Sequence, residues 1–479
     1  MSAQRIWEQA LQQWLEEAPV LIDAASGEEY FPVRFFSSVD RLRKLLLQTG
    51  KKQFLLCLEN SVLLSMLYFA AICANVELVP VDPQKSEEEK ERIFRQHPEA
   101  ERIDPLHATD LWEALQNAGE EKPVKLTELF AQTDYEKPYL ITYTSGSTGE
   151  PKGVVHSVGN LIRSAASFRD KIGYKPGGRM YHIMPMTYMA GILNTLLLPF
   201  VSDCTIVLGK RFSIMEAVSF WKTTKKYGAN YFWAAPTMLR MILTVDKKQT
   251  GAAVLKGVDT RFSVGTAPLD PGLREQFEET YGISLYQSYG LSETLFLTTQ
   301  FPGGAADKTS VGELLAGVEL RVMPDGEGRT RTPWNLLGYW TPSGLKPQAE
   351  IWYATGDLMT VQWENVRICG RKKELIIKGG MNLNPRDIEL CLQTWCGVEQ
   401  CAVQGIREDE DEKVVCWYIP EGENTQSKAF NSVIAAHLGK KYTVDYFIEL
   451  KELPKNLNGK TDKKRLKQEW EEQRRGHNA

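Results

Sequence analysis

The sequence lacks any apolar run long enough to cross a bilayer. Its longest, Val62–Ala74, is interrupted only by Ser65 and falls short of the about 20 residues that a spanning helix needs. The first residues after Met1 also lack the apolar stretch of a secretory signal peptide. We therefore expect a cytoplasmic protein without a transmembrane segment.

The sequence also lacks a large excess of either positive or negative charge. The chain has 57 Lys and Arg against 61 Asp and Glu, a net charge of −4. A dedicated nucleic-acid binder carries a clear basic excess, so no nucleic-acid partner is expected. The 479 residues are 43% hydrophobic and 25% charged, which is typical of soluble globular proteins and excludes wholesale disorder, collagen and a membrane bundle.

Closely spaced cysteine pairs are the third absence, since none of the eight cysteines forms a C-x-x-C motif. Cys391, Cys396, Cys401 and Cys416 are loosely spaced and have no histidine pattern nearby. A zinc site is therefore the weaker hypothesis for these four residues, and reduced, mostly buried thiols are the favoured one.

Apolar, β-rich runs alternate with helical patterns along the first two thirds of the chain. Asn60 or Ser61 can cap a helix after the first run, and another helix is predicted near Asn160–Phe168. Such alternation predicts an α/β fold with largely parallel strands. The predicted strands are Phe54–Leu58, Leu78–Val81, Tyr139–Tyr143, Val201–Leu208 and Tyr231–Ala235.

The pattern changes after Gly370. The charged segment Arg371–Glu374 lies between two strand-like runs, Val366–Cys369 and Leu375–Lys378, and the remaining hundred or so residues have the pattern of a small α+β unit. We predict a large α/β domain of several subdomains over residues 1–371 and a small C-terminal α+β domain over residues 372–479.

One loop carries the chemistry of a phosphate site. Thr144–Gly153 directly follows an apolar strand and contains three glycines, four hydroxyl side chains and Lys152. Glycines let backbone N–H groups approach a polyanion, and a lysine adds a cation. Pro151 before Lys152 excludes a Walker A loop, in which Gly-Lys precedes Ser or Thr at a helix start. A plain surface loop is the alternative reading of this composition.

Four further segments follow this loop in order, namely Tyr289–Thr294, Tyr353–Asp357, Gly370–Glu374 and Pro454–Lys460. With them the chain resembles the adenylate-forming superfamily of acyl- and aryl-CoA synthetases, peptide-synthetase adenylation domains and beetle luciferases. The resemblance implies that a carboxylic acid reacts with ATP to give acyl-AMP and pyrophosphate, and that a thiol such as that of CoA then displaces AMP.

The resemblance also implies the charged catalytic groups. Lys460 would reach the substrate carboxylate and the α-phosphate of ATP. Glu293, with the hydroxyl of Thr148, would hold Mg²⁺. An ordinary solvated lysine is the alternative for Lys460, because its neighbourhood is rich in lysine, with Lys455, Lys463, Lys464 and Lys467.

The nucleotide site follows from the same motifs. Asp357 resembles the aspartate that accepts hydrogen bonds from the ribose hydroxyls, and Arg371 resembles an arginine that faces the ribose. Ser292 stands where the family usually has threonine, so the hydroxyl is retained. The residues implied to contact ATP or AMP are Thr144, Ser145, Gly146, Ser147, Thr148, Gly149, Lys152, Gly265, Thr266, Ala267, Tyr289, Gly290, Ser292, Asp357 and Arg371.

A moving C-terminal domain is a further implication of the resemblance. Lys373 occupies the position of the family's hinge, about which the small domain would rotate between the two half-reactions. In the second orientation Lys378, Gly379 and Gly380 would approach CoA, because glycine lets pantetheine pass close to the backbone.

The acid-binding region departs from the family pattern. Tyr188 stands in for a common histidine, as does Val158, and Thr187–Asn194 contains no aspartate to hold a substrate amine. We therefore expect an acid without an α-amine, with Tyr188, Trp233 and Gln287 as pocket candidates. A fatty acid is slightly favoured over an aryl acid. A carrier-protein phosphopantetheine instead of CoA, a luciferase-like oxygenase and a homo-oligomeric state all stay open.

Overall fold

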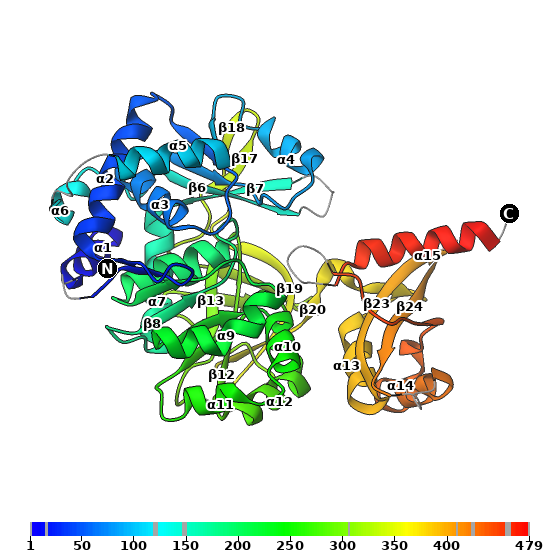
Figure 1. Cartoon of the computed structure of the whole chain (residues 1–479). Coiled ribbons are helices and arrows are strands. Elements are labelled where there is room, and N and C mark those ends of the chain that lie inside the picture. Colours follow the sequence, from blue (N-terminus) through cyan, green and yellow to red (C-terminus); the bar gives the residue numbers. More distant parts are fainter. Residues whose placement is uncertain are drawn as a thin grey trace. The chain divides into compact units, whose positions relative to one another are not determined.

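The computed structural model describes residues 2–14, 18–117, 123–145, 151–304, 307–408, 411–422, 427–455 and 461–477 (Figure 1). The chain forms two compact units. The first consists of Met1–Leu320 with Thr330–Tyr353, and the second consists of Arg321–Arg329 with Ala354–Ala479. The domain boundary predicted between residues 371 and 372 was placed at the proposed hinge, and this position lies inside the second unit. Both the boundary and the hinge stay predictions.

One sheet of the first unit carries the glycine-rich loop. Its order is β18-β17-β7-β6-β4-β3-β5. Strands β3 to β6 pair in parallel, whereas β7, β17 and β18 extend the sheet in antiparallel fashion. The bounds are β3 (Gln53–Leu56), β4 (Glu77–Pro80), β5 (Glu101–Ile103), β6 (Pro138–Ser145), β7 (Pro151–Ser157), β17 (Gly338–Thr341) and β18 (Gly344–Pro347).

A second sheet completes the first unit, in the order β14-β13-β12-β11-β10-β8-β9-β1-β2. The strands from β12 through β1 are parallel, and the outer pairs are antiparallel. The bounds are β1 (Leu21–Asp23), β2 (Glu29–Tyr30), β8 (Arg179–His182), β9 (Thr205–Leu208), β10 (Tyr231–Ala234), β11 (Arg261–Val264), β12 (Leu285–Leu291), β13 (Leu295–Thr299) and β14 (Glu313–Leu314). Strands β15 (Glu319–Val322) and β16 (Glu327–Arg331) cross the division between the two units.

Helix α3 (Val62–Ala74) is formed by the longest apolar run of the sequence and lies in the hydrophobic core. The side chain of Ser61 accepts a hydrogen bond from the backbone N–H of Leu64, and the helix ends at Asn75 in the left-handed conformation. It is apolar on all sides and almost wholly buried, as expected of a core helix. No helix in the described part of the chain is both long and apolar enough to cross a membrane.

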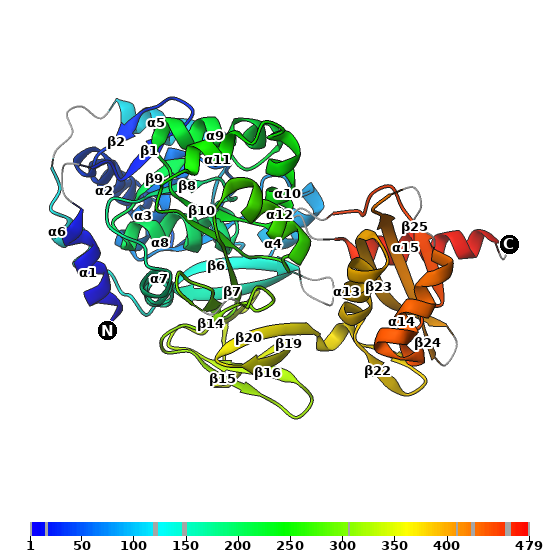
Figure 2. The same ribbon diagram turned by 90° about the horizontal axis from the view of Figure 1, so that it is seen from below.

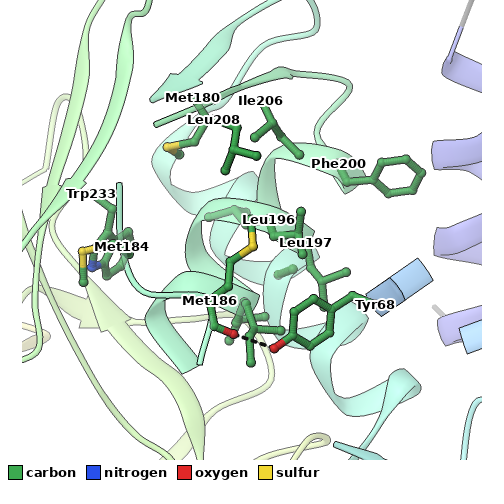
Figure 3. Close-up of a cluster of buried hydrophobic side chains, with 14 of the residues drawn as sticks. Tyr68, Met180, Met184, Met186, Leu196, Leu197, Phe200, Ile206, Leu208 and Trp233 are labelled. Atoms are coloured by element: carbon green, nitrogen blue, oxygen red, sulfur yellow. Dashed lines mark hydrogen bonds between the residues drawn. The ribbon is translucent and has the colours of Figure 1, made fainter. Parts of the chain in front are cut away.

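Other helices cover the two sheets, and Figure 1 shows α9 to α12 grouped together. Figure 3 shows part of the buried cluster, where the hydroxyl of Tyr68 donates a hydrogen bond to the carbonyl of Met186. The helices are α1 (Ala3–Gln13), α2 (Pro32–Gln48), α4 (Glu87–Phe94), α5 (Pro105–Gln116), α6 (Leu126–Leu129), α7 (Val158–Ile172), α8 (Leu198–Val201), α9 (Ile214–Tyr227), α10 (Pro236–Val245), α11 (Thr250–Leu255), α12 (Pro271–Tyr281) and a π-helix over Ala190–Leu197.

Most predicted elements are confirmed, one needs correction and one strand was not predicted. The strand predicted over Val201–Leu208 begins only at Thr205, because Pro199 lies in the first turn of α8 and its fixed φ suits a helix start. The helix predicted near Asn160–Phe168 is confirmed as α7, which begins at Val158 and is capped by the side chain of Ser157. The glycine-rich loop joins β6 to the antiparallel β7, a strand that the sequence did not predict.

The second unit is α+β, as predicted. Strands β23, β24 and β25 form a sheet (Figure 2). Both faces of this sheet bury apolar residues. Helices α13 and α14 cover the face with Val403 and Cys416, and α15 covers the face with Ala402 and Trp417. The bounds are β19 (Tyr353–Gln362), β20 (Asn365–Arg371), β21 (Ile376–Lys378), β22 (Met381–Leu383), α13 (Pro385–Trp395), β23 (Val398–Glu408), β24 (Asp411–Pro420), α14 (Phe430–Leu438), β25 (Tyr446–Glu449) and α15 (Lys463–His477), with 3₁₀ turns at Lys372–Glu374, Ser427–Ala429 and Lys440–Tyr442. All eight cysteines of the chain are free thiols.

Candidate active site

The hairpin of β6 and β7 brings the two ends of the glycine-rich loop together. Thr144 pairs with Lys152, and Ser145 pairs with Pro151. The predicted phosphate contacts Gly146, Ser147, Thr148 and Gly149 lie outside the described residues, and so does Glu150. At Gly153 an added Cβ would lie 2.9 Å from Cβ of Trp340, so glycine is required for β7 to pack there.

A buried histidine anchors the base of this hairpin. His97 Nδ1 lies 2.6 Å from Oε1 of Gln53, and its Nε2 lies 2.7 Å from the hydroxyl of Tyr143 on β6. The Trp340 ring stacks on the imidazole at 5.2 Å. Burial lowers the pKa of His97 to about 4, so the ring is neutral. Its Nδ1–H donates to Gln53, and its Nε2 accepts from Tyr143.

The turn between β12 and β13 presents the predicted magnesium carboxylate, Glu293. The turn is tight, because a Cβ on Gly290 would lie 2.0 Å from the carbonyl oxygen of Leu295. Leu295 itself has a φ of 53°, a strained value for a branched side chain. His156 on β7 donates from Nε2 to the carbonyl oxygen of Ser292 at 2.7 Å. The loop hairpin and the Glu293 turn are therefore directly joined.

Two tyrosines lie between Lys152 and Glu293. The ammonium of Lys152 is 5.9 Å from the centre of the Tyr339 ring, and the Tyr339 hydroxyl is 3.1 Å from the Tyr353 hydroxyl. Burial raises the pKa of both phenols, and the neighbouring carboxylate of Glu293 raises them further. The structure thus brings the predicted loop lysine and the predicted metal carboxylate to one place.

Neither tyrosine was assigned a role from the sequence. Tyr353 begins one of the five motifs, and that position is the only sequence signal for it. Tyr339 lies outside the motifs. It reaches the site because β17 pairs with β7, with Tyr339 opposite Val154.

The remaining nucleotide candidates of the first unit, with Trp233 and Gln287, lie on or just beyond β10, β11 and β12. Neighbouring register pairs are Ala234 with Val264 and Val264 with Gln287. The carboxyl edge of a parallel sheet is where α/β folds bind ligands. Thr266, just beyond β11, has a φ of 68°. Such strain in a β-branched residue is concentrated at functional sites. Ala267 follows this residue in the chain, and Tyr289 lies on β12.

Trp233, a pocket candidate, is also part of the hydrophobic core. Only 3% of it is exposed, and its ring lies 5.4 Å from both Phe168 and Phe296. A Cβ on Gly265 would come within 3.1 Å of the indole. The indole therefore fills the space next to Gly265.

Tyr188 is tied to a buried ion pair. Asp82, 2% exposed, accepts a hydrogen bond from Nη1 of Arg211 at 2.7 Å. Burial acts to raise the pKa of Asp82, but Arg211, the backbone N–H of Gln84 and the hydroxyl of Tyr188 outweigh it and lower that pKa. Burial and Asp82 in turn raise the pKa of Tyr188.

The chain just before Tyr188 is held by one asparagine. Asn60 Nδ2 donates to the carbonyl of Met184, and Asn60 Oδ1 accepts from the N–H of Met186, both at 2.9 Å. Together with the Tyr68 bond to Met186, these contacts fix the candidate pocket segment against α3.

In the second unit the predicted ribose pair is assembled. Arg371 Nε binds Oδ1 of Asp357 at 2.8 Å across β19 and β20. Gly356 has a φ of 72°, a conformation that favours glycine, and its N–H donates to Oε1 of Glu327 at 3.1 Å. Contact of Asp357 and Arg371 with ribose stays a prediction.

The predicted CoA residues have structural partners of their own. Lys378 Nζ lies 2.8 Å from Oδ2 of Asp445. Gly379 and Gly380 form the two-residue turn of the β21–β22 hairpin with φ values of 57° and 74°, and such turns need positive φ at both positions. Lys373, the predicted hinge, is exposed.

Lys460 lies outside the described residues. Two lysines near it in the sequence are engaged elsewhere. Lys463 Nζ lies 3.2 Å from Glu374 and 3.3 Å from Glu389, and Lys455 donates to the hydroxyl of Thr461 at 3.0 Å. These two lysines therefore have a structural role in the second unit.

The predicted metal residue Glu293 fits Mg²⁺, which needs few protein ligands, rather than a metal held entirely by protein side chains. Among the described residues, no group of three or more His, Cys, Asp or Glu is arranged to hold a metal. Magnesium commonly uses one or two carboxylates and completes its shell with water and substrate phosphates. The single carboxylate of Glu293, beside the Lys152 hairpin, matches that donor set.

The first unit defines the class of this protein. Residues 34–339 match the family model of the AMP-binding enzymes. The chain belongs to this family.

Among curated proteins, the chain is 28% identical over 350 residues to a sulfoacetate–CoA ligase of Cupriavidus necator, covering 69% of this chain and 67% of that one. It is also 28% identical over 387 residues to a 2-succinylbenzoate–CoA ligase of Bacillus pumilus, covering 76% of each. Among solved structures, ATP-bound MatB from Rhodopseudomonas palustris superposes with a TM-score of 0.83 at 21% identity, covering 98% of this chain and 99% of that one. The last likeness shows the fold.

Proposed function

We propose that the protein is an ATP-dependent acid–CoA ligase that forms acyl-AMP and then acyl-CoA. The observation that carries this proposal is the grouping of Lys152, the two tyrosines and Glu293 on the hairpin that bears the glycine-rich loop. Family membership and the named CoA ligases among the relatives support the same reaction.

Each candidate residue has its own role in the first half-reaction, the formation of acyl-AMP. Lys152 and the loop hydroxyls bind the phosphates of ATP, while Asp357 and Arg371 bind its ribose. Lys460 reaches the α-phosphate and the acid carboxylate, and so reduces the repulsion between two anions in the transition state. Mg²⁺, held by Glu293 and Thr148, would supply charge neutralisation at the phosphates.

The second half-reaction needs a different set of groups. The thiol of CoA gives up its proton to solvent, and the resulting thiolate attacks the acyl carbon. The bond from that carbon to the AMP oxygen breaks, and AMP leaves with the electron pair of that bond. Rotation about Lys373 withdraws Lys460 and brings Gly379 and Gly380 toward the thiol. A hinge is needed because Lys460 and the Gly379–Gly380 turn act at the same site in different half-reactions.

The acid is a carboxylic acid without an α-amine. A fatty acid, with a role in fatty acid metabolism, and an aryl acid are the two candidates. The indole of Trp233 fills the space beside Gly265, and Phe168 and Phe296 pack on that ring. This packing favours a flat or compact acid over a long chain at this point. Sulfoacetate and 2-succinylbenzoate, in the names of two relatives, are both compact acids.

The test is a panel of carboxylic acids scored by pyrophosphate release, with and without CoA. The panel contains short and long fatty acids, benzoate derivatives, dicarboxylates and sulfoacetate. We expect one class of acid to cause release of pyrophosphate. In the presence of CoA, the same acid should form a CoA thioester at the near-neutral pH of the cytoplasm. Pyrophosphate release that never requires an acid, or a thioester that forms only on a phosphopantetheinylated carrier protein, would contradict the proposal.

A further inference from the structure

The predicted pivot, Lys373, lies in a short turn between two charged neighbours. Residues Lys372–Glu374 form a 3₁₀ turn between β20 and β21. The hydrogen bond that closes this turn, from the N–H of Leu375 to the carbonyl of Lys372, is 3.4 Å long, beyond the usual range of about 2.7–3.2 Å. The turn by itself is therefore weakly held, and contacts of its neighbours must fix it.

Lys372, the residue before the pivot, is anchored to a buried glutamate. Its Nζ lies 3.0 Å from Oε2 of Glu327 and 2.7 Å from Oδ2 of Asp325. The Glu327 side chain is 9% exposed, and its Oε1 accepts the N–H of Gly356. A buried carboxylate needs a cation and hydrogen bonds, and Glu327 has both. The same side chain therefore holds the hinge turn and the backbone next to Asp357.

Glu374, the residue after the pivot, is anchored within the small domain. Nζ of Lys463, at the start of α15, lies 3.2 Å from Oε2 of Glu374 and 3.3 Å from Oε1 of Glu389 on α13. The same ammonium donates to the carbonyl of Val403 on β23 at 3.4 Å. Lys463 therefore joins the end of the turn to both helices and to the sheet of this domain.

Lys373 differs from both of its neighbours. Its side chain is exposed, and in the part of the chain that the structure describes it makes no ion pair or side-chain hydrogen bond. Each anchor joins groups on one side of Lys373 in the sequence, so a change in the backbone angles of this residue leaves both anchors in place. A hydrogen bond from Nδ2 of Asn384 to the carbonyl of Cys369, at 2.7 Å, crosses the pivot and would break in such a rotation.

We propose that Glu327 and Glu374 are positioning residues that fix the two flanks of the pivot, so that rotation is confined to Lys373 and ends in defined orientations. Such definition matters, because a misplacement of about 1 Å at a reacting centre can cost about a hundredfold in rate. This inference rests on the proposed function, in which the small domain rotates between the two half-reactions. The alternative is that both ion pairs only stabilise the second unit.

The experiment compares Glu327→Gln and Glu374→Gln with the control Glu469→Gln. Each substitution removes one charge and keeps a side-chain oxygen that can accept a hydrogen bond. Glu469 pairs with the exposed Arg465 on α15, so the control removes an ion pair of the second unit that does not involve the turn. Hydrogen exchange of backbone amides, expressed as protection factors, reports on the turn, and calorimetry measures AMP binding. Neither measurement needs knowledge of the acid.

Loss of either anchor should lower the protection of the Leu375 amide about fivefold. Protection in β23 and β24 should stay native, because their core is unchanged. AMP binding should stay within about twofold, since glutamine at position 327 still accepts the N–H of Gly356. With an acid from the panel above, kcat for thioester formation should fall about fivefold at an unchanged KM for ATP. Glu469→Gln should match the native protein in every measurement.

Three outcomes would overturn the anchoring role. The first is native protection of Leu375 in both variants. The second is a loss of protection that extends equally into β23 and β24, which would show a purely structural role. The third is a local loss of protection with a native kcat, which would show that the anchors do not set a productive orientation.

The hinge itself is tested separately by Lys373→Pro, which should slow thioester formation more than adenylation. Equal slowing of both steps, with the expected loss of protection in the two glutamate variants, would overturn the hinge of the proposed function. Unequal slowing with native protection in those variants would overturn the anchors alone.

Discussion

Replacing Arg211 with methionine tests the buried ion pair beside the candidate acid pocket. The substitution keeps the volume of the side chain and removes its charge, leaving the carboxylate of Asp82 without its cation. The Asp82 side chain is fully buried and that of Arg211 is 14% exposed. Removing one partner of a buried pair costs about 3–5 kcal/mol.

The lower end of that range applies to Arg211→Met. Asp82 keeps a hydrogen bond from the N–H of Gln84 at 2.9 Å, and the hydroxyl of Tyr188 also acts on it. We therefore expect a loss of about 3 kcal/mol in the free energy of unfolding at pH 7. The double variant Asp82→Asn with Arg211→Met should recover most of this loss, because it leaves no buried charge.

The pH dependence has a defined sign. In the native protein the pKa of Asp82 is lowered, so the pair contributes stability above the unfolded value of 3.8 and loses it as the pH falls through the lower folded pKa. In Arg211→Met, burial without the cation should raise that pKa. The penalty should then be full at neutral pH and shrink as acid protonates Asp82.

The assay is urea unfolding followed by tryptophan fluorescence, at pH values from 4.5 to 8, for the native protein and both variants. The control is Arg95→Met, which removes an exposed ion pair with Glu91. A penalty below about 1 kcal/mol at pH 7, the range of a surface pair, would refute the argument. A penalty of the same size at every pH would refute it as well, because the cost would then not come from a buried charge.

Three further results are expected. Lys460→Ala should abolish acid-dependent exchange of pyrophosphate into ATP while CoA still captures supplied acyl-AMP; undiminished exchange would exclude Lys460 from the adenylation step. Lys373→Pro should slow thioester formation more than adenylation in single-turnover measurements, and equal slowing of both steps would count against a hinge there. Gly290→Ala should disrupt the Glu293 turn, since the new Cβ would lie 2.0 Å from the carbonyl oxygen of Leu295, and nucleotide binding measured by calorimetry should fall at least tenfold. Tight binding in that variant would show that the turn tolerates the methyl group.

Local signals in the sequence were sufficient for most of the fold. The buried strands β3, β4, β6 and β10 follow from runs of apolar residues, and the start of α3 follows from the Ser61 cap. The strand β7 was missed because Pro151–Ser157 begins with polar and turn-forming residues. Its strand conformation depends on pairing with β6 and β17, which no local pattern reports.

The five motifs determined the family and the predicted nucleotide residues, because spacing along a chain is a property of the sequence itself. Only the tertiary structure decided which side chains meet. Tyr339 reaches Glu293 through strand pairing, Arg211 meets Asp82 across 129 positions of sequence, and Trp233 closes the space above Gly265. Such contacts are set by the packing of distant elements, and their energies depend on burial, which exists only once the chain has folded.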